Sequence, residues 1–65
     1  MIVLSKNEVT CLGNTFDEKQ QKLYIFENLC KNRNIIVQAD SENYTLSGLK
    51  DDNELELLLK LTDEI

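Results

Sequence analysis

The sequence contains no histidine, no proline and no tryptophan among its 65 residues. Without histidine, the chain lacks the commonest general base, the commonest metal ligand and the usual pH switch. Two cysteines without histidine cannot supply the four nitrogen and sulfur ligands of a structural zinc site within one chain. We therefore expect a protein that is not an enzyme and that binds no metal or cofactor.

Long apolar runs are also missing, and cysteine is scarce. No stretch approaches the roughly 20 apolar residues that a membrane-spanning helix needs, and residues 1–8 lack the basic segment of a signal peptide. We therefore expect a cytoplasmic protein that does not bind membranes. In that compartment Cys11 and Cys30, which do not form a CxxC motif, are expected to be reduced thiols in the core.

Positive charge is scarce as well, and it is unevenly distributed. The chain has 12 acidic and 7 basic residues, for a net charge of −5. Residues 40–65 hold eight of the acidic residues and only two of the basic ones. Because an acidic surface disfavours nucleic acid and anionic membranes, direct nucleic-acid binding is not expected. The acidic half can keep the protein soluble, or it can mimic nucleic-acid phosphate in the basic cleft of another protein.

A chain of this length makes one small domain, residues 1–65, with a small core. Within it, two short β-rich runs, a glycine and a helix signal occur in the same order twice. This repeat predicts an α+β fold in which two β-β-α units form a four-stranded, mainly antiparallel sheet with two helices, about 16–31 and 52–63, on one face. The strand positions expected to point inward are Ile2, Leu4, Val9, Cys11, Ile35, Val37, Tyr44 and Leu46.

A different structure is also consistent with the first part of the chain. Ser5 is followed three residues later by Glu8, which is the spacing of a helix-capping pair. On this alternative Ser5–Leu12 is a short helix, the N-terminal half is helical, and a single hairpin lies at 35–47.

The two longer helices are predicted from capping signals and apolar stripes. Thr15 and Glu18 form a capping box before the first helix, and Asp51 and Glu54 have the same spacing before the second. At about 100° per residue, the stripe of the first helix contains Phe16, Leu23, Phe26 and Cys30, and is widened by Ile25 and Leu29. The stripe of the second helix contains Leu55, Leu58, Leu59 and Thr62, with Leu57, Leu61 and Ile65 on its flank. Leu55, Leu57, Leu59 and Leu61 also alternate as in a strand, but leucine, glutamate and lysine favour the helix.

An acidic group and the apolar flank beside it form the candidate partner-binding site. The acidic residues lack the ligand spacing of an EF-hand calcium loop, so their first interpretation is a helix cap. The two wide apolar arcs exceed what one small sheet covers, which indicates association with a partner. A second copy of the chain is the simplest such partner, and would form a homodimer. The candidate contact residues are Asp51, Asp52, Glu54, Glu56, Leu57, Leu61 and Ile65.

These observations favour a small, acidic, non-enzymatic protein-binding module that inhibits or adapts another protein. Lysine outnumbers arginine six to one and there are seven asparagines, as is typical of an AT-rich genome. This bias suggests a phage- or plasmid-type accessory protein whose target is a host protein.

Two alternatives remain open. One is a nucleic-acid-associated regulator that uses the less acidic N-terminal half, and the other is a structural subunit of an assembly. The basic residues available to the regulator are Lys19, Lys22, Lys31 and Arg33.

Overall fold

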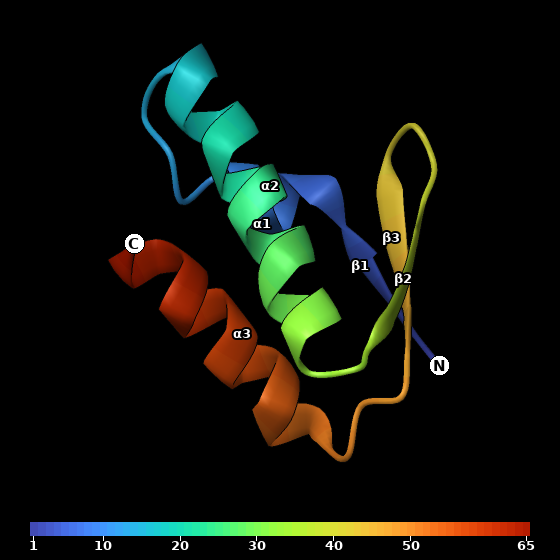
Figure 1. Ribbon diagram of the computed structural model, residues 1–65. Helices are drawn as coiled ribbons and strands as arrows, with labels where there is room; N and C mark the ends of the chain where they lie inside the picture. Colours follow the sequence, from blue (N-terminus) through green and yellow to red (C-terminus); the bar gives the residue numbers. More distant parts are fainter.

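The computed structural model, which describes residues 1–65, has three helices beside a three-stranded antiparallel sheet (Figure 1). The predicted α+β class is confirmed, whereas the four-stranded sheet built from two β-β-α units is wrong. In chain order the elements are β1 (Ile2–Ser5), α1 (Lys6–Thr10), α2 (Phe16–Asn32), β2 (Ile36–Ala39), β3 (Asn43–Ser47) and α3 (Asp52–Glu64).

The second predicted strand, around residues 9–12, is instead α1 and the turn that follows it. Ser5 ends β1 and caps α1, because its Oγ accepts a hydrogen bond of 3.2 Å from the backbone N–H of Asn7. Val9 is buried as predicted, but it reaches the core from a helix. Cys11, which was expected to point inward, is exposed. The first segment is therefore β-α-α, and the apparent repeat in the sequence is not a repeat of structure.

The caps of α2 and α3 form as predicted. Thr15 Oγ1 accepts the N–H of Glu18 at 3.2 Å, and Glu18 Oε2 accepts the N–H groups of Asn14 and Thr15 at 2.8 and 3.1 Å. Asp51 Oδ1 accepts the N–H of Glu54 at 3.0 Å. Each helix ends one residue later than predicted.

The first turns of α2 lie outside the core. Phe16 was expected in the buried stripe, yet its side chain is 75% exposed. All residues from 14 to 21 are exposed, because this end of α2 extends beyond the sheet (Figure 1). Helical periodicity therefore predicted correctly which side of α2 faces the core. The sheet is shorter than α2 and leaves the N-terminal part of that side uncovered.

The strands are arranged in the order β1-β3-β2, so that β3 is central. The β2–β3 hairpin is closed by the N–H of Asp40, which donates to Asn43 O at 3.0 Å. Asp40 Oδ1 in turn accepts the N–H groups of Glu42 and Asn43 at 2.8 and 2.7 Å. β1 then pairs with the other side of β3, with Leu4 opposite Tyr44 and Ile2 opposite Leu46.

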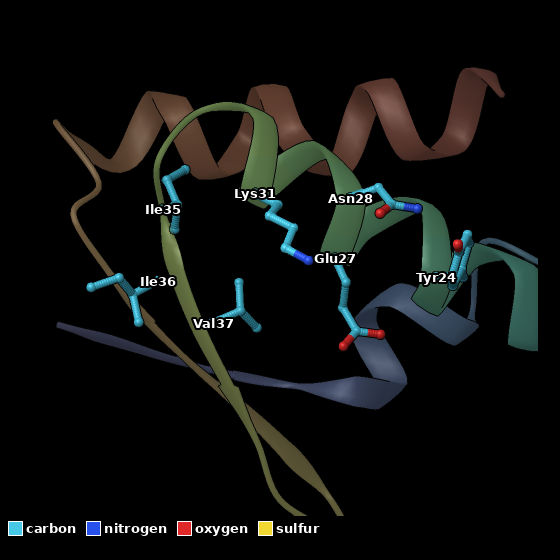
Figure 2. A pocket seen from close by; sticks show the side chains of 7 residues that line it. All are labelled: Tyr24, Glu27, Asn28, Lys31, Ile35, Ile36 and Val37. Carbon is cyan, nitrogen blue, oxygen red and sulfur yellow. The ribbon is translucent and has the colours of Figure 1, made fainter.

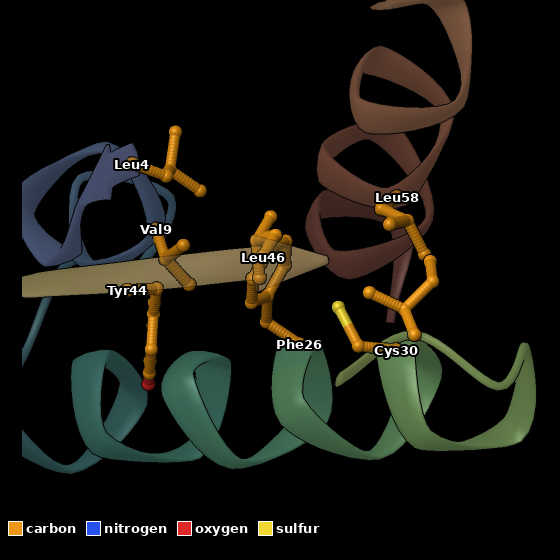
Figure 3. Close-up of a cluster of buried hydrophobic side chains, with 8 residues drawn as sticks. Leu4, Val9, Phe26, Cys30, Tyr44, Leu46 and Leu58 are labelled. Carbon is orange, nitrogen blue, oxygen red and sulfur yellow. The ribbon is translucent and has the colours of Figure 1, made fainter. Parts of the chain in front are cut away.

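One cluster of buried side chains lies between the sheet and the helices (Figure 3). The ring of Phe26 from α2 stacks on Tyr44 of the central strand, and Leu58 connects α3 to the same cluster. Thr62, also buried, donates its hydroxyl to Leu58 O at 2.8 Å. Of the predicted inward positions, Ile2 and Val37 are half-buried. The buried hydrophobic residues are Leu4, Val9, Phe26, Cys30, Ile35, Tyr44, Leu46 and Leu58.

Candidate functional site

The predicted acidic site residues lie at the start of α3. Asp51 is the N-cap, Asp52 and Glu56 are exposed, and Glu54 is half-buried. Carboxylates in the first turn stabilise a helix through its dipole. The residues form no group of three or more acidic, cysteine or histidine side chains that could hold a metal ion. Their observed contacts are those of a helix start, and Asp52 and Glu56 remain accessible to a partner.

The predicted apolar flank of α3 is divided between the core side and the solvent. Leu57 is 41% exposed and Ile65 is 70% exposed, whereas Leu61 is half-buried. The structure therefore places Leu57 and Ile65 where a partner could contact them, two helical turns apart. Leu61 contributes less accessible surface than the arc in the sequence indicated.

The basic residues considered for nucleic-acid binding do not all remain free. Lys22 Nζ donates to the backbone oxygens of Thr62 and Asp63, at 2.9 and 3.3 Å. It thereby satisfies carbonyl groups at the C-terminal end of α3, where a positive charge is favourable. Lys19, Lys31 and Arg33 are exposed.

The face of the sheet that is turned away from the core is open and carries no charged side chain. Tyr44 and Leu46 point into the core, so the alternate residues of β3 and their partners on β1 and β2 share the opposite face. Val3 is 65% exposed and Ile36 is 63% exposed on this face, and even the central Thr45 is only half-buried. Asp40 lies beyond it, at the hairpin end. We refer to these residues as the uncharged sheet face: Val3, Ser5, Ile36, Gln38, Asn43, Thr45 and Ser47.

This face was missed in the sequence, although a signal for it was present. The positions between the predicted inward residues of β2 and β3 are all uncharged, in a chain of which 29% is charged. Which strand lies beside which, however, is known only from the structure, and that arrangement brings Val3 into line with Thr45 and Gln38.

The outer edge of β2 has unpaired backbone groups. Because the N–H of Asp40 bonds to Asn43 O, the alternation of an antiparallel ladder directs Gln38 and Ile36 toward β3 as well. The N–H and C=O groups of Val37 and Ala39 consequently point away from the sheet. No backbone hydrogen bond outside the β2–β3 ladder involves either residue.

A hollow of about 490 Å³ lies beside this edge, between β2 and α2 (Figure 2). Its helical wall carries one acidic side chain, Glu27, and one basic side chain, Lys31. Its formal charge is therefore balanced. The lining residues are Tyr24, Glu27, Asn28, Lys31, Ile35, Ile36 and Val37.

The buried titratable groups near this site are held in their neutral forms. Burial, with a smaller contribution from the charges of Glu27 and Glu54, raises the pKa of the Cys30 thiol to about 11. Burial and then the neighbouring Glu27 carboxylate raise the pKa of the Tyr44 hydroxyl well above its ordinary value. Neither group is a nucleophile at neutral pH, since both remain protonated there.

The chain matches no protein-family model, no characterised protein and no solved structure. None of its helices combines the length and the apolar character needed to cross a membrane.

Proposed function

We propose that this chain is a non-enzymatic protein-binding module whose partner covers the uncharged sheet face. The observation that carries the proposal is the absence of charge from all seven outward positions of the sheet. An antiparallel sheet with one solvated face normally places polar and charged residues there. Depletion of charge is instead the mark of the centre of a protein interface.

The apolar side chains of this face are placed to anchor such a partner. Val3 on β1 and Ile36 on β2 are both more than half exposed and lie on the two edge strands. Between them, Thr45 and Ser47 of β3 offer hydroxyl groups that can hydrogen-bond to a partner. The arrangement is two β-branched apolar contacts around a polar, uncharged centre.

The acidic residues of α3 have a supporting role in this proposal. Asp52 and Glu56 are exposed on a helix that is separate from the sheet face. A net charge of −5 accelerates the approach of a basic partner and keeps the free protein soluble. Exposed Leu57 on the same helix is the alternative apolar contact.

The proposal is tested by affinity capture from a lysate of the source cells with the parent chain and two variants. The first variant is Val3→Lys with Ile36→Lys, which places charge on the sheet face. The matched control is Leu57→Lys, which makes the same kind of change at an exposed apolar residue of α3. We expect a captured protein to be retained by the parent and by the control, and to be lost with the sheet-face variant. Loss with Leu57→Lys alone would place the contact on α3 instead.

A further inference from the structure

The free edge of β2 differs from the free edge of β1 in the groups that it offers. On β2 the N–H and C=O groups of Val37 and Ala39 point away from the sheet and are unpaired, while those of Gln38, between them, point toward β3. The N–H of Ile35 donates to Cys30 O at 2.9 Å, so the open edge begins only after Ile35. On β1 the outward positions are Val3 and Ser5, and Ser5 already turns into α1 as its N-cap. The two strands are equally long, but on β2 neither outward residue has a second structural role.

β2 lacks most of the features that keep another strand from pairing with a sheet edge. Natural edge strands are protected by short length, charge, proline, a bulge or a covering element. β2 is short, with four residues. Ile36–Ala39 has no charged residue and no proline, and it pairs with β3 in continuous register. Its residues are exposed except for half-buried Val37. An edge of this kind is a template for intermolecular β-pairing.

We infer that the edge of β2 pairs with β2 of a second copy of this chain, antiparallel about a twofold axis at Gln38, to form a continuous six-stranded sheet. In that register Val37 of each copy lies opposite Ala39 of the other. Each of these two pairs exchanges both N–H···O=C bonds, so all four free groups of each edge are satisfied. A shift of the register to place Val37 opposite Val37, or Ala39 opposite Ala39, would leave only one such pair.

Charge permits a second copy at this edge, although it opposes contact between two copies elsewhere. Two molecules of net charge −5 repel each other over most of their surfaces. The β2 strand is uncharged, and Glu27 and Lys31 balance each other on the helical wall beside it. Asp40 would lie opposite Ile36 of the partner rather than opposite another carboxylate. The β2 edge is thus a surface on which two identical copies meet without like charges in register.

The packing on both faces of the sheet also fits this pairing. Gln38 meets its own equivalent on the outer face, where two amide groups can hydrogen-bond to each other. On the inner face the small Ala39 lies beside Val37 of the partner, which avoids crowding below α2. The uncharged sheet faces of the two copies meet at Gln38, with Asp40 of each copy beside Ile36 of the other. The inference does not rest on the proposed function, which needs no dimer, although Ile36 and Gln38 of β2 belong to both surfaces.

The experiment uses single cysteines on the two edges of the sheet in a Cys11→Ser background, which removes the exposed native thiol. Gln38→Cys places a thiol on the axis, where the Cα atoms of a non-hydrogen-bonded pair are about 4.5 Å apart and within disulfide range. The control is Val3→Cys, in the same cross-strand row but on the β1 edge. Under mild oxidation we expect Gln38→Cys to become a disulfide-linked dimer, whereas Val3→Cys, which still pairs through β2, should form no disulfide between the two copies.

A second measurement is independent of cysteine chemistry. Sedimentation of the parent chain at tens of micromolar should give twice the monomer mass of 7.5 kDa. Ala39→Lys, which adds a charge at the edge, should give a monomer with unchanged circular dichroism. A parent chain that sediments as a monomer, or equal cross-linking of the two cysteine variants, would overturn the inference. Neither result would affect partner capture through the sheet face.

Discussion

The aromatic rings of Phe26 and Tyr44 are stacked, with their centroids 5.6 Å apart and their planes inclined by 30°. This pair joins the middle of α2 to the central strand and lies in the only sizeable core that the domain has. The ammonium group of Lys6 lies 5.4 Å from the centroid of the same tyrosine ring, within the range of a cation–π contact. Helix α2, the central strand β3 and the start of α1 thus meet at Tyr44.

Replacing Phe26 should therefore remove most of the stability of the domain. The side chain is fully buried, and Phe→Ala changes in cores cost about 3–5 kcal/mol, as much as a core of this size supplies. Leu23 is only half-buried, so Leu23→Ala should cost less. Urea unfolding followed by circular dichroism measures both, with Tyr24→Ala, 69% exposed, as the control. If Phe26→Ala and Tyr24→Ala had equal midpoints, the core described here would be wrong.

Gly13→Ala should destabilise the protein even though the change adds only one methyl group. A Cβ atom at residue 13 would lie 2.7 Å from Lys19 N and 2.8 Å from the carbonyl carbon of Glu18. Both are backbone atoms of α2 and cannot rotate away, so the loop must move. Overpacking of this kind costs about 1–3 kcal/mol. The measurement is the change in melting temperature, which should fall clearly below that of the parent; an unchanged value would show that the loop before α2 is free to shift.

Two carboxylates should make the protein less stable in acid. The N–H groups of Asn14 and Thr15 lower the pKa of Glu18 below its ordinary value of 4.5. Those of Glu42 and Asn43 lower the pKa of Asp40 below 3.8. A carboxylate whose pKa is lowered by folding stabilises the native state above its unfolded pKa and loses that contribution as the pH falls through the folded value. Stability should therefore be constant from neutral pH to about pH 5 and decline below it.

The variants Glu18→Gln and Asp40→Asn isolate these two contributions. Each should be less stable than the parent at neutral pH and should lose less stability between neutral and acid conditions. Thermal unfolding at several pH values provides the comparison, and Glu8→Gln, a change of the same kind at an exposed residue of α1, is the control. Parallel pH curves for Glu18→Gln and the parent would rule out this role of the capping box.

The apolar flank of α3 should respond unequally to added charge. Leu57 is 41% exposed, so Leu57→Glu should change the free energy of unfolding by no more than about 0.5 kcal/mol. Leu61 is half-buried, so Leu61→Glu loses apolar contacts and partly desolvates a carboxylate; it should cost more than Leu57→Glu, about 1–3 kcal/mol. Chemical unfolding of the two single variants distinguishes them. Equal stability would mean that both leucines are accessible and that α3 offers a wider binding surface than described.

Helices α2 and α3 could be predicted because their signals are local. A capping box and an acidic N-cap act within one turn, and the hydrogen bonds of Thr15, Glu18 and Asp51 are the ones that the sequence pattern predicts. The buried positions Phe26, Cys30, Leu58 and Thr62 follow from helical periodicity in the same way.

The sequence by itself thus determined the α+β class, the two long helices and the inward side of the β2–β3 hairpin. Only the tertiary structure decided that residues 6–10 are helical, since Val9 can reach the core equally well from a strand or from a helix turn capped by Ser5. It also decided that β3 lies between β1 and β2, because pairing between distant strands depends on which edge the rest of the chain leaves open. That order lines up Val3, Thr45 and Gln38 on one uncharged face and leaves Val37 and Ala39 on a free edge. The two surfaces proposed to bind partners therefore follow from strand pairing. The sequence contains only the uncharged alternate positions of β2 and β3, and does not show which strands lie side by side.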